Sequence, residues 1–313
     1  MYYNQGNQDN GVYPIFEVPY QAANLTEAAG TKPKFWFTHP DHGECLFKEG
    51  RPNSGDDWSE KVASELCELI SLSHATYHLA SWRGRKGVIS PKFLPPGADL
   101  IHGNLLMAKV VPDYPGKIFF HVHQHTLKRV LAIMRSERIR PPLGWAATEG
   151  VRTAVDVFVG YLMLDVWIAN HDRHHENWSL VLTRERAIHL APTYDHASSL
   201  GANETDPNRL DRLTTRDEGR SMRRYVERAM SAFYPSVSPA AKPMSTMEAF
   251  QEAGRFRLDA VQAWLRRLEQ VSHNDTRRIL GQLPPQRITP PAIDFAQRML
   301  EINRERLLAL GRA

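Results

Sequence analysis

Alternating apolar and polar positions predict strands near the start of the chain. Lys34 to Phe37 is a short aromatic run that predicts a strand, and Glu44 to Lys48 predicts its antiparallel partner. Pro40 and Gly43 lie between the two runs and are residues that favour turns. The two strands are therefore expected to form a hairpin.

A helix is predicted after this hairpin, followed by a second pair of strands. Asp56 or Asp57 is expected to cap the helix, which runs to about Leu72 because its apolar residues recur at the helical period. Residues 75–82 and 87–94 predict two further strands around a polar turn. The apolar stripe of the helix consists of Trp58, Val62, Leu66 and Leu69.

The rest of the chain is mainly helical in its pattern. Residues 125–138 predict one helix, and residues 149–169 predict another that is apolar on nearly every face and so is expected to be buried. Residues 178–183 and 187–190 predict a small strand pair. Residues 209–312 have the Arg, Leu, Glu and Ala content of helices.

These elements predict an α+β fold with two lobes. We expect an irregular segment over residues 1–24, a small mixed N-terminal lobe over residues 25–94, and a larger helical C-terminal lobe over residues 95–313. The length of 313 residues is sufficient for a core without metal or disulfide support.

Composition narrows the class of protein. Hydrophobic residues make up 42% and charged residues 24%, which excludes a chain that is disordered throughout. Cys45 and Cys67 are the two cysteines, so a disulfide framework is excluded and a reducing, cytoplasmic environment is expected. The longest apolar run, Val157 to Ala169, contains Asp165 and is too short to span a membrane. The N-terminus shows no signal-peptide pattern.

Positive charge is concentrated in the second part of the chain. Residues 207–313 carry 19 Lys and Arg against 12 Asp and Glu, and 18 of the 19 are Arg. An Arg-rich region could face nucleic acid or an acidic partner, but no recognised nucleic-acid-reading motif is present. We therefore favour solvated helix faces over direct nucleic-acid binding.

Three polar residues on loops suggest phosphoryl transfer. Asp172 and Asn177 follow the buried helix, and Asp195 follows the small strand pair. In a kinase one carboxylate orients the acceptor hydroxyl and takes its proton, while an Asn and a second carboxylate hold Mg²⁺ against the nucleotide phosphates. Asp172 is predicted to be the base, and Asn177 and Asp195 are predicted to bind the metal.

An upstream lysine and glutamate complete the kinase order. Lys48 ends a predicted strand, where it could neutralise phosphate oxygens, and Glu60 lies on the following helix, where it could hold the lysine. Glu65 lies nearer the apolar stripe of that helix and is an alternative partner for Lys48.

The segment from Asn170 to Asn177, followed by Leu190 to Asp195, resembles the core of HipA-type serine/threonine kinases, which are bacterial toxin kinases. The resemblance implies a two-lobed kinase fold, binding of ATP and Mg²⁺, and transfer of phosphate to a Ser or Thr of a protein. It also implies that Asp172 is the catalytic base and that Asn177 and Asp195 bind Mg²⁺. By position it also assigns Gly30, Thr31 and Lys34 to the loop that covers the phosphates, and residues 88–93 to adenine contacts.

The resemblance also implies regulation and partners. Autophosphorylation is expected, with Thr26 or Thr31 as candidate sites, and so is an antitoxin partner. Longer family members carry an N-terminal subdomain, so either a separate small protein supplies it here or nothing does. A bacterial, cytoplasmic protein is expected, with secretion to a host as an alternative.

A metal-dependent phosphohydrolase is the main rival reading. His171, His174 and His175 lie beside Asp172, and His121 and His123 alternate as on one strand face. Asp195 could complete such a metal site. The histidine segment has no helical spacing of apolar residues and reads as a loop, so hydrogen bonding is favoured over metal binding.

Overall fold

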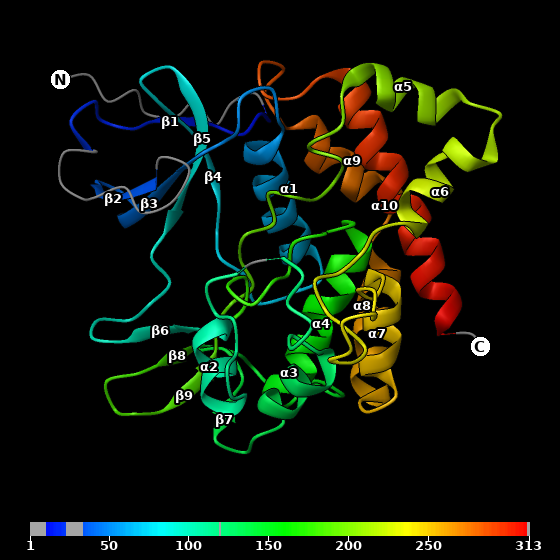
Figure 1. The fold of residues 1–313 in the computed structure, drawn as a ribbon. Coiled ribbons are helices and arrows are strands. Elements are labelled where there is room, and N and C mark those ends of the chain that lie inside the picture. The colour runs from blue at the N-terminus through cyan, green and yellow to red at the C-terminus, as the bar shows by residue number, and fades with distance from the viewer. Residues whose placement is uncertain (1–10, 23–33, 119, 312–313) are drawn as a thin grey trace.

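The computed structural model describes residues 11–22, 34–118 and 120–311. Its helices are α1 (Asp56–Leu69), α2 (Gly103–Val110), α3 (Leu127–Met134), α4 (Ala154–Trp167), α5 (Asp206–Thr214), α6 (Met222–Glu227), α7 (Thr246–Gly254), α8 (Leu258–Gln270), α9 (His273–Gly281) and α10 (Pro290–Leu310). Its strands are β1 (Ile15–Glu17), β2 (Lys34–His39), β3 (Gly43–Glu49), β4 (His78–Trp82), β5 (Arg85–Pro91), β6 (Asp99–His102), β7 (Ile139–Arg140), β8 (Ser179–Leu182) and β9 (Ile188–Leu190). A mixed sheet precedes a largely helical region, which confirms the predicted α+β class (Figure 1).

The first sheet has five strands in the order β1-β4-β5-β3-β2. The predicted hairpin is confirmed, because β2 pairs antiparallel with β3, which begins directly after the turn at Gly43 with a φ of +68°. Alternate residues of β2 are buried, and Phe35 and Phe37 join Phe47 of β3 in one apolar cluster. The same register places Lys48 opposite Val88 of β5, near the end of β3.

The prediction that residues 1–24 are irregular is wrong at Ile15–Glu17, which forms β1. This strand pairs in parallel with β4, so Ile15 lies opposite Leu79. A three-residue strand shows no alternation in the sequence, and a parallel partner lies far along the chain. The sequence also failed to predict β6, β7 and α2.

Helix α1 packs against β4, β5 and α9 (Figure 1). Its cap is Gly55 rather than an aspartate, and a Cβ at Gly55 would lie 2.1 Å from Nε1 of Trp58. Asp56 and Asp57 occupy the first turn, where the positive end of the helix dipole favours negative charge. Asp57 also accepts a 2.7 Å hydrogen bond from buried Arg287, which ties the helix to the chain before α10.

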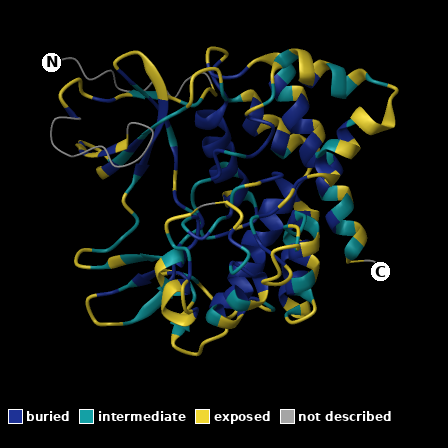
Figure 2. Cartoon of the chain, viewed as in Figure 1, coloured by how far each residue is buried: buried dark blue, intermediate teal, exposed yellow. Residues whose placement is uncertain are grey.

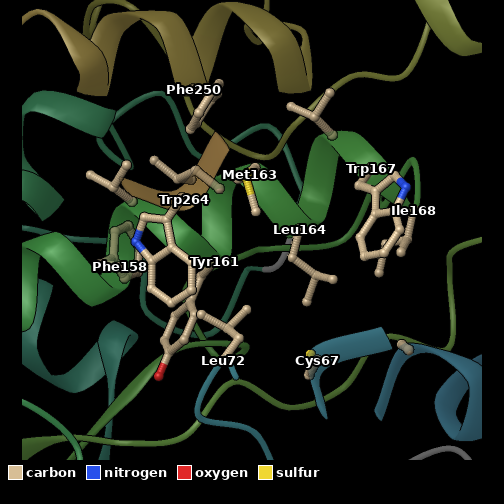
Figure 3. Close-up of a cluster of buried hydrophobic side chains, with 14 of the residues drawn as sticks. Cys67, Leu72, Phe158, Tyr161, Met163, Leu164, Trp167, Ile168, Phe250 and Trp264 are labelled. Carbon is tan, nitrogen blue, oxygen red and sulfur yellow. The ribbon is translucent and has the colours of Figure 1, made fainter. Parts of the chain in front are cut away.

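Helix α4 is the centre of the core, and all of its residues are buried. Figure 3 shows side chains of α4 packed between Phe250 and Trp264 on one side and Cys67 of α1 on the other. A Cβ at Gly160 of α4 would lie 2.5 Å from the ring of Trp264 on α8, so the absence of a side chain at Gly160 lets these two helices pack closely. The expected burial is confirmed, and Figure 2 shows the same dark core. No helix in the described ranges is long and apolar enough to cross a membrane.

The second sheet has four strands in the order β6-β8-β9-β7. The predicted strand pair is confirmed as the antiparallel hairpin β8–β9. This hairpin separates the loop 170–177 from the segment 191–196, and it returns the chain beside its starting point. The two segments are in contact, because the hydroxyl of Tyr194 donates to the carbonyl of Glu176 at 2.6 Å.

Candidate active site

Lys48 lies at the centre of an ion-pair cluster. Its Nζ donates hydrogen bonds to Oε1 of Glu60 at 2.7 Å and to Oδ1 of Asp195 at 2.9 Å. The cluster therefore joins β3, α1 and the segment after β9. Glu65 instead pairs with Lys61, so the structure distinguishes the two glutamates that the sequence left open.

Glu60 is held from two sides. Its side chain is 1% exposed, and its Oε2 accepts a 2.7 Å hydrogen bond from the backbone N–H of His196. The neighbouring Ser59 hydroxyl donates to the carbonyl of Ala197 at 2.9 Å. Helix α1 is thereby attached to the chain directly after Asp195, and Glu60 positions both Lys48 and this segment.

The charges of the cluster follow from burial and proximity. Burial acts to lower the pKa of Lys48, but Asp195 and Glu60 outweigh it and raise that pKa well above its usual value. Burial acts to raise the pKa of Asp195, yet Lys48 lowers it to about 2. Burial, with the nearby Asp195 charge, raises the pKa of Glu60 to about 7 against the pull of Lys48. Lys48 and Asp195 are therefore charged at neutral pH.

The backbone of Asp195 is strained. Its φ is +61°, a conformation that costs about 1–2 kcal/mol for a residue with a Cβ. The ion pair with Lys48 and a 3.2 Å hydrogen bond from its N–H to the hydroxyl of Tyr77 hold it there. Non-glycine residues in this conformation concentrate at functional sites.

The loop from Asn170 to Asn177 is anchored by a buried ion pair. Arg173 donates to both carboxylate oxygens of Asp165 at 2.5 and 2.6 Å, and its third contact is the carbonyl of Asn177 at 3.0 Å. Asn170 donates to the same carboxylate at 2.8 Å. Arg173 is therefore a positioning residue, a role that its place in the sequence did not predict. The available signal was Asp165, a lone acid in a helix that is otherwise apolar.

Asp172 and Asn177 lie within this loop. The side-chain amide of Asn177 donates to the carbonyl of Asp172 at 2.6 Å and so closes the loop. The Asp172 carboxylate lies 3.7 Å from Nε2 of His174 and 3.5 Å from the hydroxyl of Ser198. Burial raises its pKa, partly offset by His174. A carboxylate of this kind is a suitable general base.

A cleft of about 380 Å³ opens beside Lys48. We call it the lysine cleft. Phe93 and Tyr194 form a stacked pair in its wall, with ring centroids 6.3 Å apart. Of the residues expected near adenine, those from Ser90 to Phe93 line the cleft. Val88 does not line it but is buried against Ala75 and Tyr77, which do, and Ile89 is buried in the apolar cluster of the first sheet. Gly30 and Thr31 lie outside the described residues. The members of the cleft used below are Lys34, Lys48, Asn177 and Asp195.

A second hollow of about 190 Å³ lies on the other side of the loop. We call it the histidine pocket, and its walls include Phe120, His121, His125, Asp172, His174 and Tyr234. Asp172 lines this pocket and not the lysine cleft, whereas Asn177 and Asp195 line only the cleft. The loop therefore presents its candidate base and its candidate metal ligands to different hollows.

The histidines that the structure describes near this loop are arranged for hydrogen bonding. Among the residues that the structure describes, no group of three His, Cys, Asp or Glu is arranged to hold a metal ion. His125 accepts a hydrogen bond from Trp178 and contacts the carbonyl of Ala232, so both of its ring nitrogens are used. The alternation of His121 and His123 lies in a turn before α3, which also begins two residues later than predicted. The metal-hydrolase reading has no support in this geometry.

Comparison with known proteins gives the class of fold. No family model matches the sequence, and no curated protein matches it. The structure is similar to CtkA, a proinflammatory kinase of Helicobacter pylori, with a TM-score of 0.70, 16% identity, and coverage of 95% of this chain and 99% of that one. It is also similar to HipA of the Shewanella oneidensis toxin–antitoxin system, solved with HipB and operator DNA. That match has a TM-score of 0.56, 13% identity, and coverage of 91% of this chain and 65% of that one.

These likenesses establish a protein-kinase-like fold, as the sequence predicted. The chain spans nearly all of CtkA but less than two thirds of the HipA chain. At these identities the comparison defines the architecture, and the roles of individual residues rest on the geometry described above.

Proposed function

We propose that this protein is an ATP-dependent serine/threonine protein kinase of HipA type. The observation that carries the proposal is the contact of Lys48 with both Glu60 and Asp195 inside a kinase-like fold. A strand lysine, a helix glutamate and a loop aspartate in contact are the parts that orient nucleotide phosphates in kinases. In an ordinary surface ion pair the glutamate is exposed to solvent, whereas the Glu60 side chain is 1% exposed.

The residues of the lysine cleft fit ATP with Mg²⁺. Lys48 binds one oxygen of Asp195, while the other oxygen and the amide oxygen of Asn177 make no hydrogen bond within the described part of the chain. Carboxylate and amide oxygens are the ligands that Mg²⁺ takes from proteins. Asn177 and Asp195 would hold the ion, which supplies neutralisation of phosphate charge. Lys48 and Lys34 add positive charge at the same wall.

Asp172 acts on the acceptor. Its carboxylate accepts the proton of a Ser or Thr hydroxyl as the hydroxyl oxygen bonds to the γ-phosphorus. The bond from that phosphorus to the β–γ bridging oxygen breaks, and ADP leaves with the electron pair. His174 stabilises the Asp172 carboxylate before proton transfer, because it lies 3.7 Å away.

The finer assignment includes regulation. Autophosphorylation at Thr26 or Thr31 would add about −1.5 to −2 charge near bound nucleotide and so weaken ATP binding. Both residues lie outside the described ranges. An antitoxin partner, or a small protein that supplies an N-terminal subdomain, also remains a proposal based on the resemblance to HipA-type kinases, and so does a cytoplasmic location.

The test is incubation with γ-labelled ATP and Mg²⁺, followed by mass spectrometry of the chain and of added proteins. We expect phosphate on Ser or Thr, and transfer slowed by about 10²–10⁴-fold with Asp172→Asn. A phosphosite map without Thr26 and Thr31 would remove the regulatory assignment only. Release of free phosphate with no protein product would contradict the kinase assignment itself.

A further inference from the structure

The histidine pocket has preformed walls. Residues of the segments 120–126 and 231–243 form adjacent parts of the wall, and the backbone N–H of Tyr234 donates to the carbonyl of His125 at 3.1 Å. The rings of His123 and Tyr234 are 4.4 Å apart, and Nδ1 of His125 lies 3.0 Å from the carbonyl of Ala232. These contacts hold the two segments together on one side of the pocket, which reduces the ordering cost of binding there.

The chemistry of the pocket differs from that of the lysine cleft. Asp172 is the only Asp, Glu, Lys or Arg among its lining residues, and all of these belong to the described part of the chain. Its apolar members include Phe120, Val122 and Pro243, and Phe120 is 69% exposed and so lies at the mouth. Burial lowers the pKa of His125 to about 3, which keeps this side chain uncharged at neutral pH.

The size of the pocket limits what it can hold. Sites for small organic ligands usually enclose roughly 300–1,000 Å³, whereas this pocket encloses about 190 Å³. That volume admits one or two side chains of a protein segment and not a nucleotide. None of the described residues that line the pocket is a lysine or arginine, the side chains that usually bind a phosphate group.

We propose that the histidine pocket receives the acceptor segment, and that it selects a Ser or Thr next to an uncharged apolar residue. The hydroxyl reaches Asp172, and the apolar neighbour packs on Phe120 at the mouth. This inference rests on the proposed kinase function and deepens it. Phe120 is then a specificity-determining residue, because it contacts the neighbour of the acceptor rather than the reacting atoms.

The experiment uses the full chain, saturating ATP and Mg²⁺, and a set of synthetic peptides with one central Ser or Thr. The residue beside the hydroxyl is varied between Leu, Phe, Asp and Lys. We expect kcat/KM to be about tenfold higher for the apolar neighbours, which is the discrimination that an apolar contact usually gives. Affinity for MgATP is measured in parallel by calorimetry.

Two variants and one control separate the pocket from general effects. Phe120→Ala should remove the apolar preference, and Phe120→Lys should shift it toward the Asp peptide by charge attraction. Phe256→Ala is the matched control, because Phe256 is another exposed phenylalanine, 48% exposed, that lines neither hollow. MgATP affinity should be unchanged in all three variants.

The outcomes distinguish a failure of the pocket assignment from a failure of the proposed kinase function. An apolar preference that Phe120→Ala leaves intact, or a loss that Phe256→Ala reproduces, overturns the assignment of the pocket. Binding of MgATP without transfer to any peptide also overturns it, because a short segment should suffice to fill 190 Å³. Absence of MgATP binding in the wild type overturns the kinase function first.

Discussion

The two hollows beside the loop 172–177 differ in how they use charge. The lysine cleft contains Lys48 and Asp195 in direct contact at 2.9 Å, with Glu60 buried behind them. The histidine pocket has imidazole, aromatic and aliphatic walls, and Asp172 is its one carboxylate among the described lining residues. A polyanionic nucleotide is complementary to the first and a neutral hydroxyl-bearing side chain to the second.

Under the proposed function, one short loop would serve two ligands. Asn177 faces the cleft, whereas Asp172 faces the pocket, and the hydrogen bond from the Asn177 amide to the Asp172 carbonyl fixes the relation between them. The buried ion pair between Arg173 and Asp165 anchors the loop to α4. Rigid support of this kind keeps reacting groups in register, which a flexible loop would not do.

The separation is tested most strongly by Asp172→Asn. Loss of a positioned general base lowers kcat by about 10²–10⁴-fold, whereas affinity for MgATP should change little because Asp172 does not line the cleft. Single-turnover phosphoryl transfer and calorimetry measure the two quantities. An equal loss of both would show that Asp172 is a metal ligand and that the two hollows act as one.

A double-mutant cycle on Lys48 and Asp195 tests the cleft. Lys48→Ala and Asp195→Ala should each weaken MgATP binding by about tenfold or more, and the double variant should lose less than the sum, because groups in contact are not additive. Removal of Mg²⁺ with a chelator should reproduce the Asp195 effect. Lys128→Ala, at an exposed lysine of α3, is the control. A silent Lys48→Ala would contradict the role of the cleft.

Glu60→Gln also tests the lysine cleft, with a smaller expected effect on activity. Gln can still accept the hydrogen bond from His196, but it removes a carboxylate whose pKa is raised to about 7. Below pH 7 the wild-type Glu60 is protonated and resembles Gln, so the two proteins should converge. Above pH 7 the wild type should be about tenfold better in kcat/KM, by the value of one charged hydrogen bond.

The matched control for this variant is Glu65→Gln. Glu65 lies on the same helix and pairs with Lys61, so its loss should leave kcat/KM and its pH profile unchanged. Equal effects of the two substitutions would mean that the contact of Glu60 with Lys48 has no function.

His125→Gln tests the neutral wall of the pocket through stability. The unfolded chain binds a proton on this histidine below about pH 6.5, whereas the folded protein resists it down to a pKa of about 3. Stability of the wild type therefore falls as pH drops through this range. Between pH 7.5 and 5 the variant should lose about 2 kcal/mol less than the wild type, measured by urea unfolding. Parallel curves would show that His125 accepts a proton in the folded state.

Local patterns accounted for much of the fold. The hairpin β2–β3, the buried helix α4 and the hairpin β8–β9 were predictable because each depends on turn residues or on a sustained apolar pattern over neighbouring positions. Element ends were less predictable: α1 begins after Gly55 and ends at Leu69 rather than at Leu72. Caps depend on contacts such as the ring of Trp58 against Gly55, which spacing does not reveal.

The candidate site divides in the same way. The order of Lys48, Asp172, Asn177 and Asp195 was visible in the sequence, since each has a side chain suited to phosphate or metal chemistry. The choice between Glu60 and Glu65 was not, because both lie on one helix and helical spacing left both open. Only the packing of α1 against the sheet placed Glu60 beside Lys48.

The sequence by itself determined the residue types, their order and the elements that carry them, because these follow from local propensity and periodicity. The tertiary structure decided which of them meet. The pairing of β1 with β4, the contact between Lys48 and Asp195 across 147 positions, and the walls of the histidine pocket all join distant segments. Such contacts form when the whole core buries its apolar surface. The free energy of this burial depends on the complete fold, so no local stretch of the sequence predicts it.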